Sequence, residues 1–535
     1  MEDIAIIGGG PAGAAAARLL AQWGHAVLLL TRPAPRGLLA ESIPPSCRKL
    51  FDVIGVTAAV DNGGFIRSTG NTVCWGGEER VGPFAPGTYG WQVDRARFDE
   101  VLLGAALAGG AEVLANATVR GVATGDGHSI VRFDTDTGSE QVAARWVLDC
   151  SGRAGVLARR WRGPGAALAG PGMPPPGPHD HAHDHAHDHA HDHAHDHPDV
   201  SADVSARAHE HQRGVARRTL ALLGTWDRSE GWALADETHT IVESYEGGWA
   251  WSVPVSPTRR CIAVMVDPSL TELSGGDRLL AAYHAELRKT TRLRARLEHA
   301  ALAAAPWACD ASPYRATRVS EGRHLAVGDA VSFVDPLSSF GVKKALASAW
   351  LAAVVTHSCI EQPAIERAAL QLYETRERVM YESLQRQSAE FARRAAAEHA
   401  HDFWAERADL DASDQPGEPD IAALRQDPAV LDAFEALKRQ DGIRLRLRDE
   451  VRKVELAVVR GNRVVLATHL VCDAFPHGVR FLRDVDLLTL VTLAPEWPQV
   501  HELFEAYNRA APPVPLADFL GALSTLIAMG LLRNA

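Results

Sequence analysis

The glycine-rich segment 8–13, with the sequence GGGPAG, can bind a pyrophosphate through its backbone. An apolar run at 3–7 precedes it and an alanine-rich stretch at 14–23 follows, which predicts a buried strand, a turn and a helix. In that arrangement the free N–H groups and the positive dipole of the helix N-terminus face the phosphates. We therefore predict a dinucleotide site whose contacts come from Gly8, Gly10, Pro11, Ala12 and Gly13.

Two later segments have residue types suited to the same ligand. The sequence DCSGR occupies 149–153, and GDA at 328–330 is followed by FVDP at 333–336. A second strand is predicted at 25–30, and Thr31 follows it where an acidic residue usually binds the adenosine ribose. A threonine hydroxyl makes a weaker hydrogen bond than a carboxylate does. The three segments together predict an FAD site that also uses Thr31, Arg32, Gly152, Gly328 and Asp329.

The composition narrows the class of protein. With 535 residues the chain exceeds a single ordinary core, so we expect two or more domains. No apolar run reaches the length of a membrane span, and the chain enters a strand at once, so we expect a cytoplasmic protein. The seven cysteines show no CxxC spacing, which argues against a disulfide framework or a zinc ribbon. A net charge of −12 argues against a nucleic-acid partner.

Histidine at every odd position from His179 to His197 marks a break in composition. The tract follows a Pro/Gly-rich stretch and cannot bury an apolar face, so we predict a disordered insertion over residues 163–208. Clustered imidazoles and carboxylates bind zinc, nickel or copper nonspecifically, but a flexible chain fixes no geometry for a specific metal site. A solvated linker and a metal-sequestering segment are both open interpretations.

The apolar periodicity predicts an α/β (α+β) chain, with a Rossmann-like FAD-binding domain and an antiparallel substrate sheet within residues 1–410. Hairpin strands are expected at 118–122, 129–133 and 140–144, ahead of a separate apolar strand at 146–148. The substrate sheet would contain 219–225, 238–245, 248–255 and 260–266. Long helices are expected at 275–299, 342–359 and 365–408.

A linker at 411–419 separates a C-terminal module, residues 420–535. A hairpin of 451–458 and 463–470 is followed by helices at 482–490, 499–509 and 516–529. A hairpin with three helices is typical of winged-helix and peptide-binding modules, so we predict a small winged-helix-like module. A structural cap or a dimerisation element is an equally good interpretation.

Residues 1 to about 400 resemble the flavin-dependent aromatic hydroxylase and halogenase superfamily. Glu41 and Ser42, ahead of IPP, resemble the family's loop beside the flavin, and QVDR at 92–95 resembles the start of a cofactor-contacting helix. The resemblance implies a p-hydroxybenzoate-hydroxylase-like fold in which Asp329 binds the FAD ribitol and 336–341 lies beside the isoalloxazine ring. It adds these predicted cofactor contacts: Glu41, Ser42, Gln92, Pro336, Gly341 and Val342.

Within that superfamily the chain is most similar to tryptophan-halogenase-like proteins. GWAWSVP at 248–254 matches their W-x-W-x-I-P motif with Val for Ile, and 333–341 matches F-x-x-P-x-x-S-x-G. The resemblance implies that Trp249 and Trp251 keep the flavin from acting directly on substrate, whereas their spacing alone is typical of two core residues on one strand face. Phe340 stands where a residue beside the halide is expected, so we place it in the substrate pocket with both tryptophans.

Halogenases of this type have a lysine that carries or orients hypohalous acid, eight residues before a tryptophan. Aligning Phe65 and Trp75 with that segment places Arg67 at the lysine position. An arginine stays protonated and cannot form a chloramine, so it cannot replace the lysine in this chemistry. Arg67 and Ser339 are our catalytic candidates near the oxygen-transfer path, with a surface cation as the alternative for Arg67.

Superfamily members without the lysine include flavoproteins that hydroxylate a protein tryptophan in tryptophylquinone cofactor biogenesis. The resemblance therefore implies an FAD-dependent monooxygenase that hydroxylates an indole-type aromatic through a flavin hydroperoxide. Its co-substrates would be O2 and NAD(P)H, or reduced flavin from a reductase partner. The most specific form of this prediction is that the substrate is a tryptophan in a protein or peptide. One alternative is a halogenase of a small or carrier-bound aromatic. Another is a non-catalytic flavoprotein that acts in assembly or metal handling.

Overall fold

The structure is a computed structural model that describes residues 2–32, 39–161, 218–271, 277–338, 340–409, 423–439 and 442–534. The predicted histidine tract, the linker 411–419 and Ser339 lie outside these ranges. The chain forms two compact units, Met1–Ala353 with Leu384–Leu410, and Val354–Ser383 with Asp411–Ala535. The second unit thus includes 354–383, which lie before the predicted boundary at 410. Within the described ranges, no helix has both the length and the hydropathy needed to cross a bilayer.

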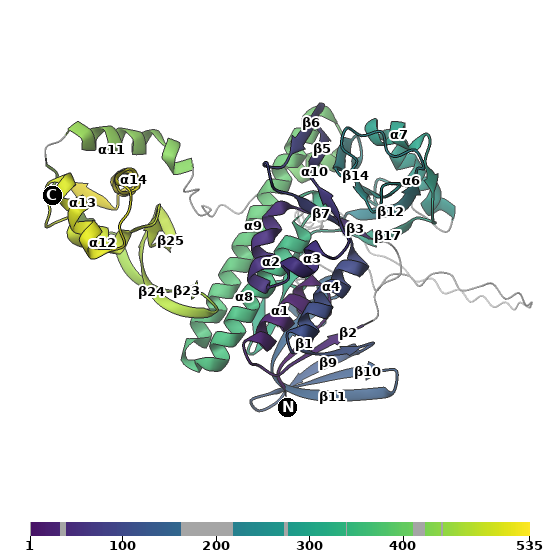
Figure 1. The fold of residues 1–535 in the computed structure, drawn as a ribbon, viewed down its shortest axis with the longest axis horizontal. Coiled ribbons are helices and arrows are strands. Elements are labelled where there is room, and N and C mark those ends of the chain that lie inside the picture. Colours follow the sequence, from purple (N-terminus) through teal and green to yellow (C-terminus); the bar gives the residue numbers. More distant parts are fainter. Residues whose placement is uncertain are drawn as a thin grey trace, which may run out of the picture. The chain divides into compact units, whose positions relative to one another are not determined.

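A mostly parallel sheet forms the base of the first unit (Figure 1). Its main path has the order β19-β20-β11-β1-β2-β8, in which β20, β11, β1, β2 and β8 are parallel neighbours. Helices α1 (Pro11–Gln22) and α4 (Arg95–Ala108) pack against each other beside it. The strands are β1 (Glu2–Ile7), β2 (Val27–Thr31), β8 (Glu112–Ala115), β11 (Gly138–Asp149), β19 (Ser320–Glu321) and β20 (His324–Ala326).

One strand of this sheet is longer than predicted. β9 (Thr118–Thr124) and β10 (Ser129–Thr135) are the expected hairpin strands. The two strands expected at 140–144 and 146–148 are instead the single strand β11, because its first half pairs with β10 and its second half with β1. Arg145 does not interrupt the strand, since its guanidinium pairs with Asp3 of β1 at 3.2 Å.

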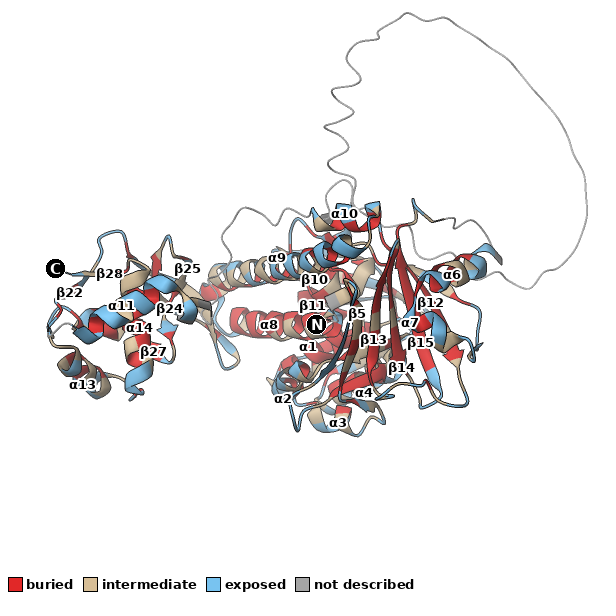
Figure 2. Ribbon diagram, turned by 90° about the horizontal axis from the view of Figure 1, so that it is seen from above, coloured by how far each residue is buried: buried red, intermediate tan, exposed pale blue. Residues whose placement is uncertain are grey.

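The second sheet of the first unit has the order β16-β12-β15-β14-β13-β5-β6, with β17 beside β12. Its buried residues concentrate on the central strands, as Figure 2 shows. The four predicted strands are present: β12 (Leu220–Asp227), β13 (Thr240–Tyr245), β14 (Gly248–Pro254) and β15 (Arg259–Val266). The prediction missed β5 (Gly70–Trp75), which joins β13 in parallel, as well as β6 (Glu78–Pro83), β16 (Ala301–Leu302) and β17 (Trp307–Asp310).

Two helices that were predicted as continuous are each divided. The Glu243 carboxylate accepts hydrogen bonds from three backbone N–H groups at 291–293, so α7 (Arg292–Leu297) begins anew after α6 (Asp277–Lys289). His401 Nδ1 accepts from Phe403 N at 3.1 Å and starts α10 (Asp402–Ala408) after α9 (Glu366–Glu398). The helix predicted at 342–359 is continuous as α8 (Gly341–Glu361).

The second unit contains the predicted hairpin and helices. β23 (Arg452–Arg460) and β24 (Arg463–Cys472) pair around a tight turn, and β25 (Phe475–Val479) pairs with the far side of β24. Leu490, Tyr507 and Phe519 are central to its core, which is built by α11 (Pro428–Arg439), α12 (Leu487–Leu493), α13 (Val500–Ala510) and α14 (Leu516–Ala528). The winged-helix assignment stays a prediction.

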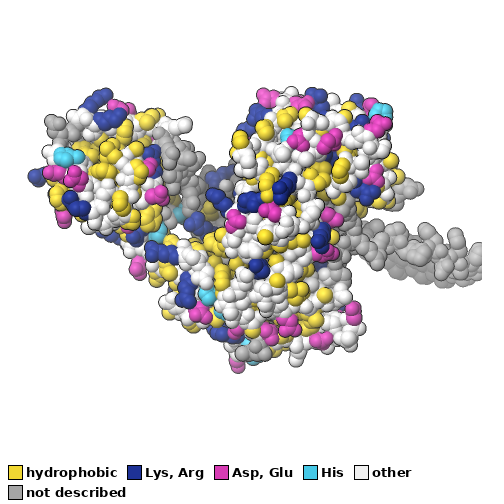
Figure 3. Space-filling model, in the orientation of Figure 1, with side chains coloured by type: hydrophobic (Ala, Val, Ile, Leu, Met, Phe, Trp, Pro, Cys, Tyr) yellow, Lys and Arg dark blue, Asp and Glu magenta, His cyan; other side chains and the backbone are white. Residues whose placement is uncertain are grey.

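Short elements complete the described chain. A small sheet of order β3-β7-β4 carries several of the predicted cofactor contacts. Charged side chains of both signs are interspersed on the face of the first unit that Figure 3 shows. The remaining bounds are β3 (Ala40–Ile43), α2 (Arg48–Ile54), α3 (Thr57–Asp61), β4 (Ile66–Ser68), β7 (Gly90–Asp94), β18 (Tyr314–Arg315), β21 (Ser332–Phe333), β22 (Leu445–Leu447), β26 (Phe481–Leu482), β27 (Val485–Asp486) and β28 (Leu532–Asn534).

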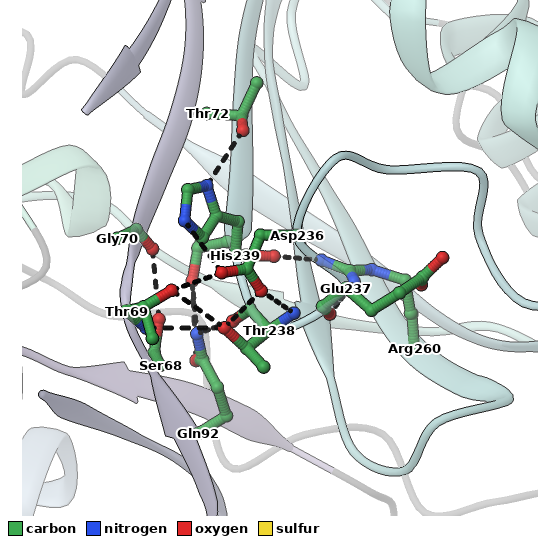
Figure 4. A network of polar contacts seen from close by, with 11 residues as sticks. Ser68, Thr69, Gly70, Thr72, Gln92, Asp236, Glu237, Thr238, His239 and Arg260 are labelled. Atoms are coloured by element: carbon green, nitrogen blue, oxygen red, sulfur yellow. Dashed lines mark hydrogen bonds and ion pairs between the residues drawn. The ribbon is translucent and has the colours of Figure 1, made fainter. Parts of the chain in front are cut away.

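A buried arginine fastens the loop before β13 to the second sheet (Figure 4). Arg260 of β15 is 0% exposed and donates to Ser252 Oγ at 2.8 Å, to Glu237 O at 3.1 Å and to His239 O at 2.5 Å. Burial lowers the pKa of Arg260 to about 9. His239 also lies 3.2 Å from Thr72 Oγ1 of β5, so the network joins β5, β15 and the intervening loop.

We predict that Arg260→Met destabilises the protein by about 3 kcal/mol, because the buried oxygens that it serves would lose their donor. The neighbouring Arg259 is a matched control, since it is exposed and pairs with Asp227 at 2.7 Å. Arg259→Met should cost less than about 1 kcal/mol. Urea unfolding measures both changes, and equal losses would contradict a structural role for the Arg260 network.

We also predict that His239 makes stability depend on pH. Burial, reinforced by Arg260 and opposed by Asp236, lowers the pKa of His239 below its ordinary value of 6.5. The unfolded chain therefore binds this proton more readily, so the contribution is present above about pH 6.5 and is lost as the pH falls below it. In urea unfolding, His239→Gln should flatten the loss of stability on acidification, whereas His501→Gln, at an exposed position of α13, should leave it unchanged. An unaltered slope in His239→Gln would refute this assignment.

Candidate flavin site

Three sequence motifs meet at one edge of the parallel sheet. β1, β11 and β20 are in register, with Ile7 opposite Asp149 and Asp149 opposite Ala326. The turns after these strands carry the glycine-rich segment, 151–153 and 328–330. Ligands of open parallel sheets bind at the carboxyl ends of the strands. The arrangement therefore gathers all three predicted motifs where a dinucleotide would bind.

The glycines of the first motif have different structural roles. Gly8 has a φ of +105°, and a Cβ there would meet the backbone of Cys150. A Cβ at Gly13 would overlap the carbonyl oxygen of Gly8, so Gly13 allows α1 to pack on the turn. At Gly10, the N-cap of α1, an added Cβ meets nothing within 4 Å. This open position beside the first turn, formed by Pro11 and Ala12, fits a pyrophosphate.

The second motif forms a turn that is held by its own carboxylate. Asp149 is fully buried and accepts hydrogen bonds from the N–H groups of Ser151, Leu157 and Ala158. Asp149 therefore shapes the loop instead of binding a ligand. Gly152 has a φ of +66° with open space at its Cβ position, and its turn contacts the turn 328–330.

A buried lysine that sequence reasoning missed holds the third motif. Lys344 of α8 is 3% exposed and donates to Gly328 O at 2.9 Å and to Ser332 O. Its Nζ lies 3.5 Å from Asp329 Oδ1, so it also positions Asp329, the residue predicted to bind the FAD ribitol. Gly328 has a φ of +63°, and a Cβ there would lie 3.2 Å from Ala12 of the first motif. Two adjacent lysines in the sequence gave no reason to distinguish this buried amine.

The predicted loop residues on β3 are joined to α4 by an ion-pair group. Glu41 Oε1 lies 2.5 Å from Arg95 Nη1, and Asp99 Oδ1 lies 3.3 Å from Arg95 Nε. Burial would lower the pKa of Arg95, but the Glu41 and Asp99 carboxylates raise it. Ser42 follows on β3, opposite Gln92 of β7. Glu41 thus has a protein partner, and Ser42 stays a predicted flavin contact.

Other predicted contacts also have partners within the protein. Gln92 is 2% exposed and its amide donates to Thr238 O at 2.9 Å and to Thr240 Oγ1 at 3.0 Å, which ties β7 to β13. Thr31 ends β2. A Cβ added at Gly9 would meet the Thr31 side chain, so the two residues lie close together. The Thr31 hydroxyl donates to Arg32 O at 3.3 Å. Thr31 therefore lies against the glycine turn, where a ribose contact is expected.

Five tryptophans belong to one apolar cluster on the second sheet, Trp307 of β17 among them. Trp249 and Trp251, on one face of β14, join Trp75 and Trp404 there. The indole N–H groups of Trp75 and Trp404 donate to backbone carbonyls at 2.8 Å. Those of Trp249 and Trp251 are buried without an acceptor among the described residues. Trp249 is 1% exposed and packs edge-on against Trp75, so these indoles belong to a packed core in which two N–H donors are uncommitted.

The segment after the third motif connects the flavin motifs with this cluster. Phe333 stacks on Tyr314 with 6.2 Å between ring centroids, and Arg153 of the second motif lies 5.3 Å from its ring. Phe333 and Leu337 both pack on the tryptophan cluster. Asp335 lies between them in the chain and is buried, and burial raises its pKa. Sequence reasoning named no acid or base, and Asp335 is the buried carboxyl of this segment.

The end of the same segment brings a second lysine to the predicted pocket. Pro336 begins a short turn, and Gly341 and Val342 begin α8. Lys343 Nζ lies 4.8 Å from the ring centroid of Phe340, which we had placed in the substrate pocket. The sequence carries no signal for Lys343, because the lysine that the halogenase resemblance implies lies ahead of Trp75.

Arg67 lies on β4 and is exposed. Its guanidinium stacks over the ring of Tyr89 at 4.5 Å, and its described contacts do not include the tryptophan cluster. This placement fits the surface-cation alternative, and a catalytic role for Arg67 stays a prediction.

We predict that Gly10→Ala weakens FAD binding at least about tenfold without changing the melting temperature of the apoprotein, because its methyl group occupies only the pyrophosphate space. Gly13→Ala is the matched control. Its methyl group meets the Gly8 carbonyl, so it should destabilise the apoprotein by about 2 kcal/mol. Flavin fluorescence titration and calorimetry separate the two effects. Unchanged FAD affinity in Gly10→Ala would exclude this turn as the phosphate site.

Two family models match successive parts of the chain. Residues 1–163 match the model described as FAD binding domain, and residues 225–441 match the model described as tryptophan halogenase. The chain is 26% identical over 391 residues to the tryptophan 2-halogenase of Chondromyces crocatus, which covers 69% of this chain and 64% of that protein. It is 26% identical over 399 residues to the flavin-dependent halogenase armH3 of Armillaria mellea, with 68% and 69% covered. The chain thus spans less than two thirds of the first relative.

Solved structures of similar fold include halogenases and a hydroxylase. The flavin-dependent halogenase CmlS has a TM-score of 0.71 and 20% identity, with 100% of this chain and 96% of that chain covered. The peptidyl tryptophan dihydroxylase QhpG has a TM-score of 0.64 and 20% identity, with 99% of each chain covered. These likenesses concern the fold, whereas the cofactor follows from the FAD-binding model and the named relatives. The chain is thus similar to proteins of the flavin-dependent halogenase-like superfamily, and its match to the FAD-binding model makes FAD its cofactor.

Proposed function

We propose that this chain is a monooxygenase that uses FAD to hydroxylate an indole-type aromatic, and that a tryptophan within a protein or peptide is its substrate. The likeness in fold to a peptidyl tryptophan dihydroxylase along 99% of both chains supports the protein-bound substrate. Bound FAD would supply the two-electron activation of dioxygen, with electrons from NAD(P)H or a flavin reductase.

The observation that carries this proposal is the placement of lysine. The whole chain has six lysines, and none stands eight residues before Trp75. Arg67 occupies that position, and Lys344 is committed to backbone carbonyls of the third motif. Lysine-dependent transfer of hypohalous acid therefore lacks an amine at the position that the halogenase segment predicts, while oxygen transfer needs none.

The residues of the chain would act on substrate in three ways. The tryptophan cluster excludes water and stacks on an aromatic ring, and the indole N–H groups of Trp249 and Trp251 can hold a polar atom of the substrate. Asp335 can accept the proton that leaves the ring, because its carboxyl is buried in the segment 333–337, which packs on the tryptophan cluster. Lys344 and the turn at 328–330 hold Asp329 in position.

One observation favours a halogenase as the second candidate function. Lys343 lies beside Phe340, so an amine is available next to the predicted pocket, although at another position of the sequence. The named relatives are halogenases. In this alternative the Lys343 amine would take the part of the missing lysine.

We expect the enzyme, supplied with reduced FAD and isotopically heavy dioxygen, to add a heavy oxygen atom to a tryptophan-containing peptide, with or without bromide. Mass spectrometry of the peptide and of free tryptophan measures the product. A brominated product instead of a hydroxylated one would overturn the hydroxylase proposal.

Lys343→Met separates the two candidate functions. Hydroxylation should retain most of its rate in this variant, because the amine is not part of the oxygen transfer, whereas halogenation that uses the amine should be lost. Lys49→Met is the matched control, since Lys49 is exposed.

A further inference from the structure

Strand β23 has an unpartnered edge. Along its whole length, from Arg452 to Arg460, it pairs only with β24 on one side. No backbone hydrogen bond joins its other side to any described residue. An antiparallel edge strand presents a row of unpaired N–H and C=O groups along its outer side. Such a row is a template for another extended chain. Its nine residues are long for an edge strand.

The side chains of β23 are apolar but stand outside the core of the second unit. Val454, Leu456, Val458 and Val459 are half-buried, and none belongs to the core that the helices build. On the neighbouring strand, Leu466 is 50% exposed and lies opposite Ala457 in the register. An added strand would cover the half-buried side chains of β23, which the described residues leave partly in water.

The two ends of the same strand are basic. Arg452 and Lys453 begin it and Arg460 ends it, while Glu455 is its single acid. Among the described residues, none of these three cations has an ion pair or a hydrogen bond from its side chain. Three cations against one acid give the strand a net charge of +2, opposite in sign to the −12 of the whole chain. The charge favours an acidic occupant.

We propose that β23 is a docking edge for an extended acidic peptide, which adds to the sheet as a strand beside it. Backbone hydrogen bonds would hold the peptide, an apolar residue beside Ala457 would pack against it, and acidic residues at the ends would pair with Arg452, Lys453 and Arg460. As a way to hold a polypeptide substrate, this docking rests on the proposed function. The docking itself is measured without turnover, so either can fail while the other stands.

The test uses the full chain and fluorescein-labelled peptides of nine residues, the length of β23. One peptide alternates valine and threonine and has glutamates at both ends; a second has lysines at the ends. A third keeps the glutamates but has prolines at alternate positions, which removes the N–H groups needed for strand addition. We expect the acidic peptide to bind at least about tenfold more tightly than either of the others.

Two further measurements locate the bound peptide. Hydrogen exchange of the amides at 452–460 should slow when the acidic peptide binds. The charge-reversal variant Arg452→Glu, Lys453→Glu and Arg460→Glu should weaken binding at least about tenfold. The matched control reverses three exposed arginines that already have acidic partners, Arg80→Glu, Arg97→Glu and Arg120→Glu, and should leave binding unchanged.

Several outcomes would overturn the proposal. Equal binding of the proline-containing peptide would show charge attraction without strand addition. Binding without slower exchange at 452–460 would place the peptide elsewhere, and no binding of the acidic peptide at about 1 mM would exclude the site. Concentration-dependent protection of 452–460 without peptide, together with dimers in sedimentation, would make a second copy of the chain the occupant.

Discussion

The register of three parallel strands is the constraint on which the site depends. Because Ile7, Asp149 and Ala326 are level with one another, the turns after β1, β11 and β20 emerge side by side although they are far apart in sequence. A shift of one residue in any pairing would displace one turn and turn its side chains to the opposite face. Strand pairing thus determines the geometry of cofactor binding, and the loops only complete it.

Buried charges then stabilise the segments that the sheet brings together. Lys344 holds the third motif, Arg95 joins two carboxylates beside β3, and Arg260 fastens the loop before β13. Each has several oxygen partners, as a cation removed from water requires. These cations are structural, whereas the apolar tryptophan cluster offers only two uncommitted donors. In the proposed function, substrate recognition would therefore depend on aromatic contact more than on charge.

The sequence predicted the strand-turn-helix of the first motif, the four central strands of the second sheet and the tail hairpin, because each has a local pattern. It did not reveal β5 in that sheet, since a parallel partner from the N-terminal part of the chain leaves no trace in periodicity. Lys343 and Lys344 were missed for a related reason. Adjacent lysines look alike in a sequence, and only the packing of α8 buries one and leaves the other beside Phe340.

The different surroundings of the glycines bear on how such sequences diverge. Gly8 and Gly13 satisfy the backbone itself, whereas Gly10 leaves room for something outside the chain. In a lineage that no longer used a flavin, selection for folding would still preserve Gly8 and Gly13, while position 10 would drift. The first and last glycines of such a motif can therefore be retained after the ligand is lost. Only the middle glycine, Gly10 in this chain, indicates whether the ligand is still bound.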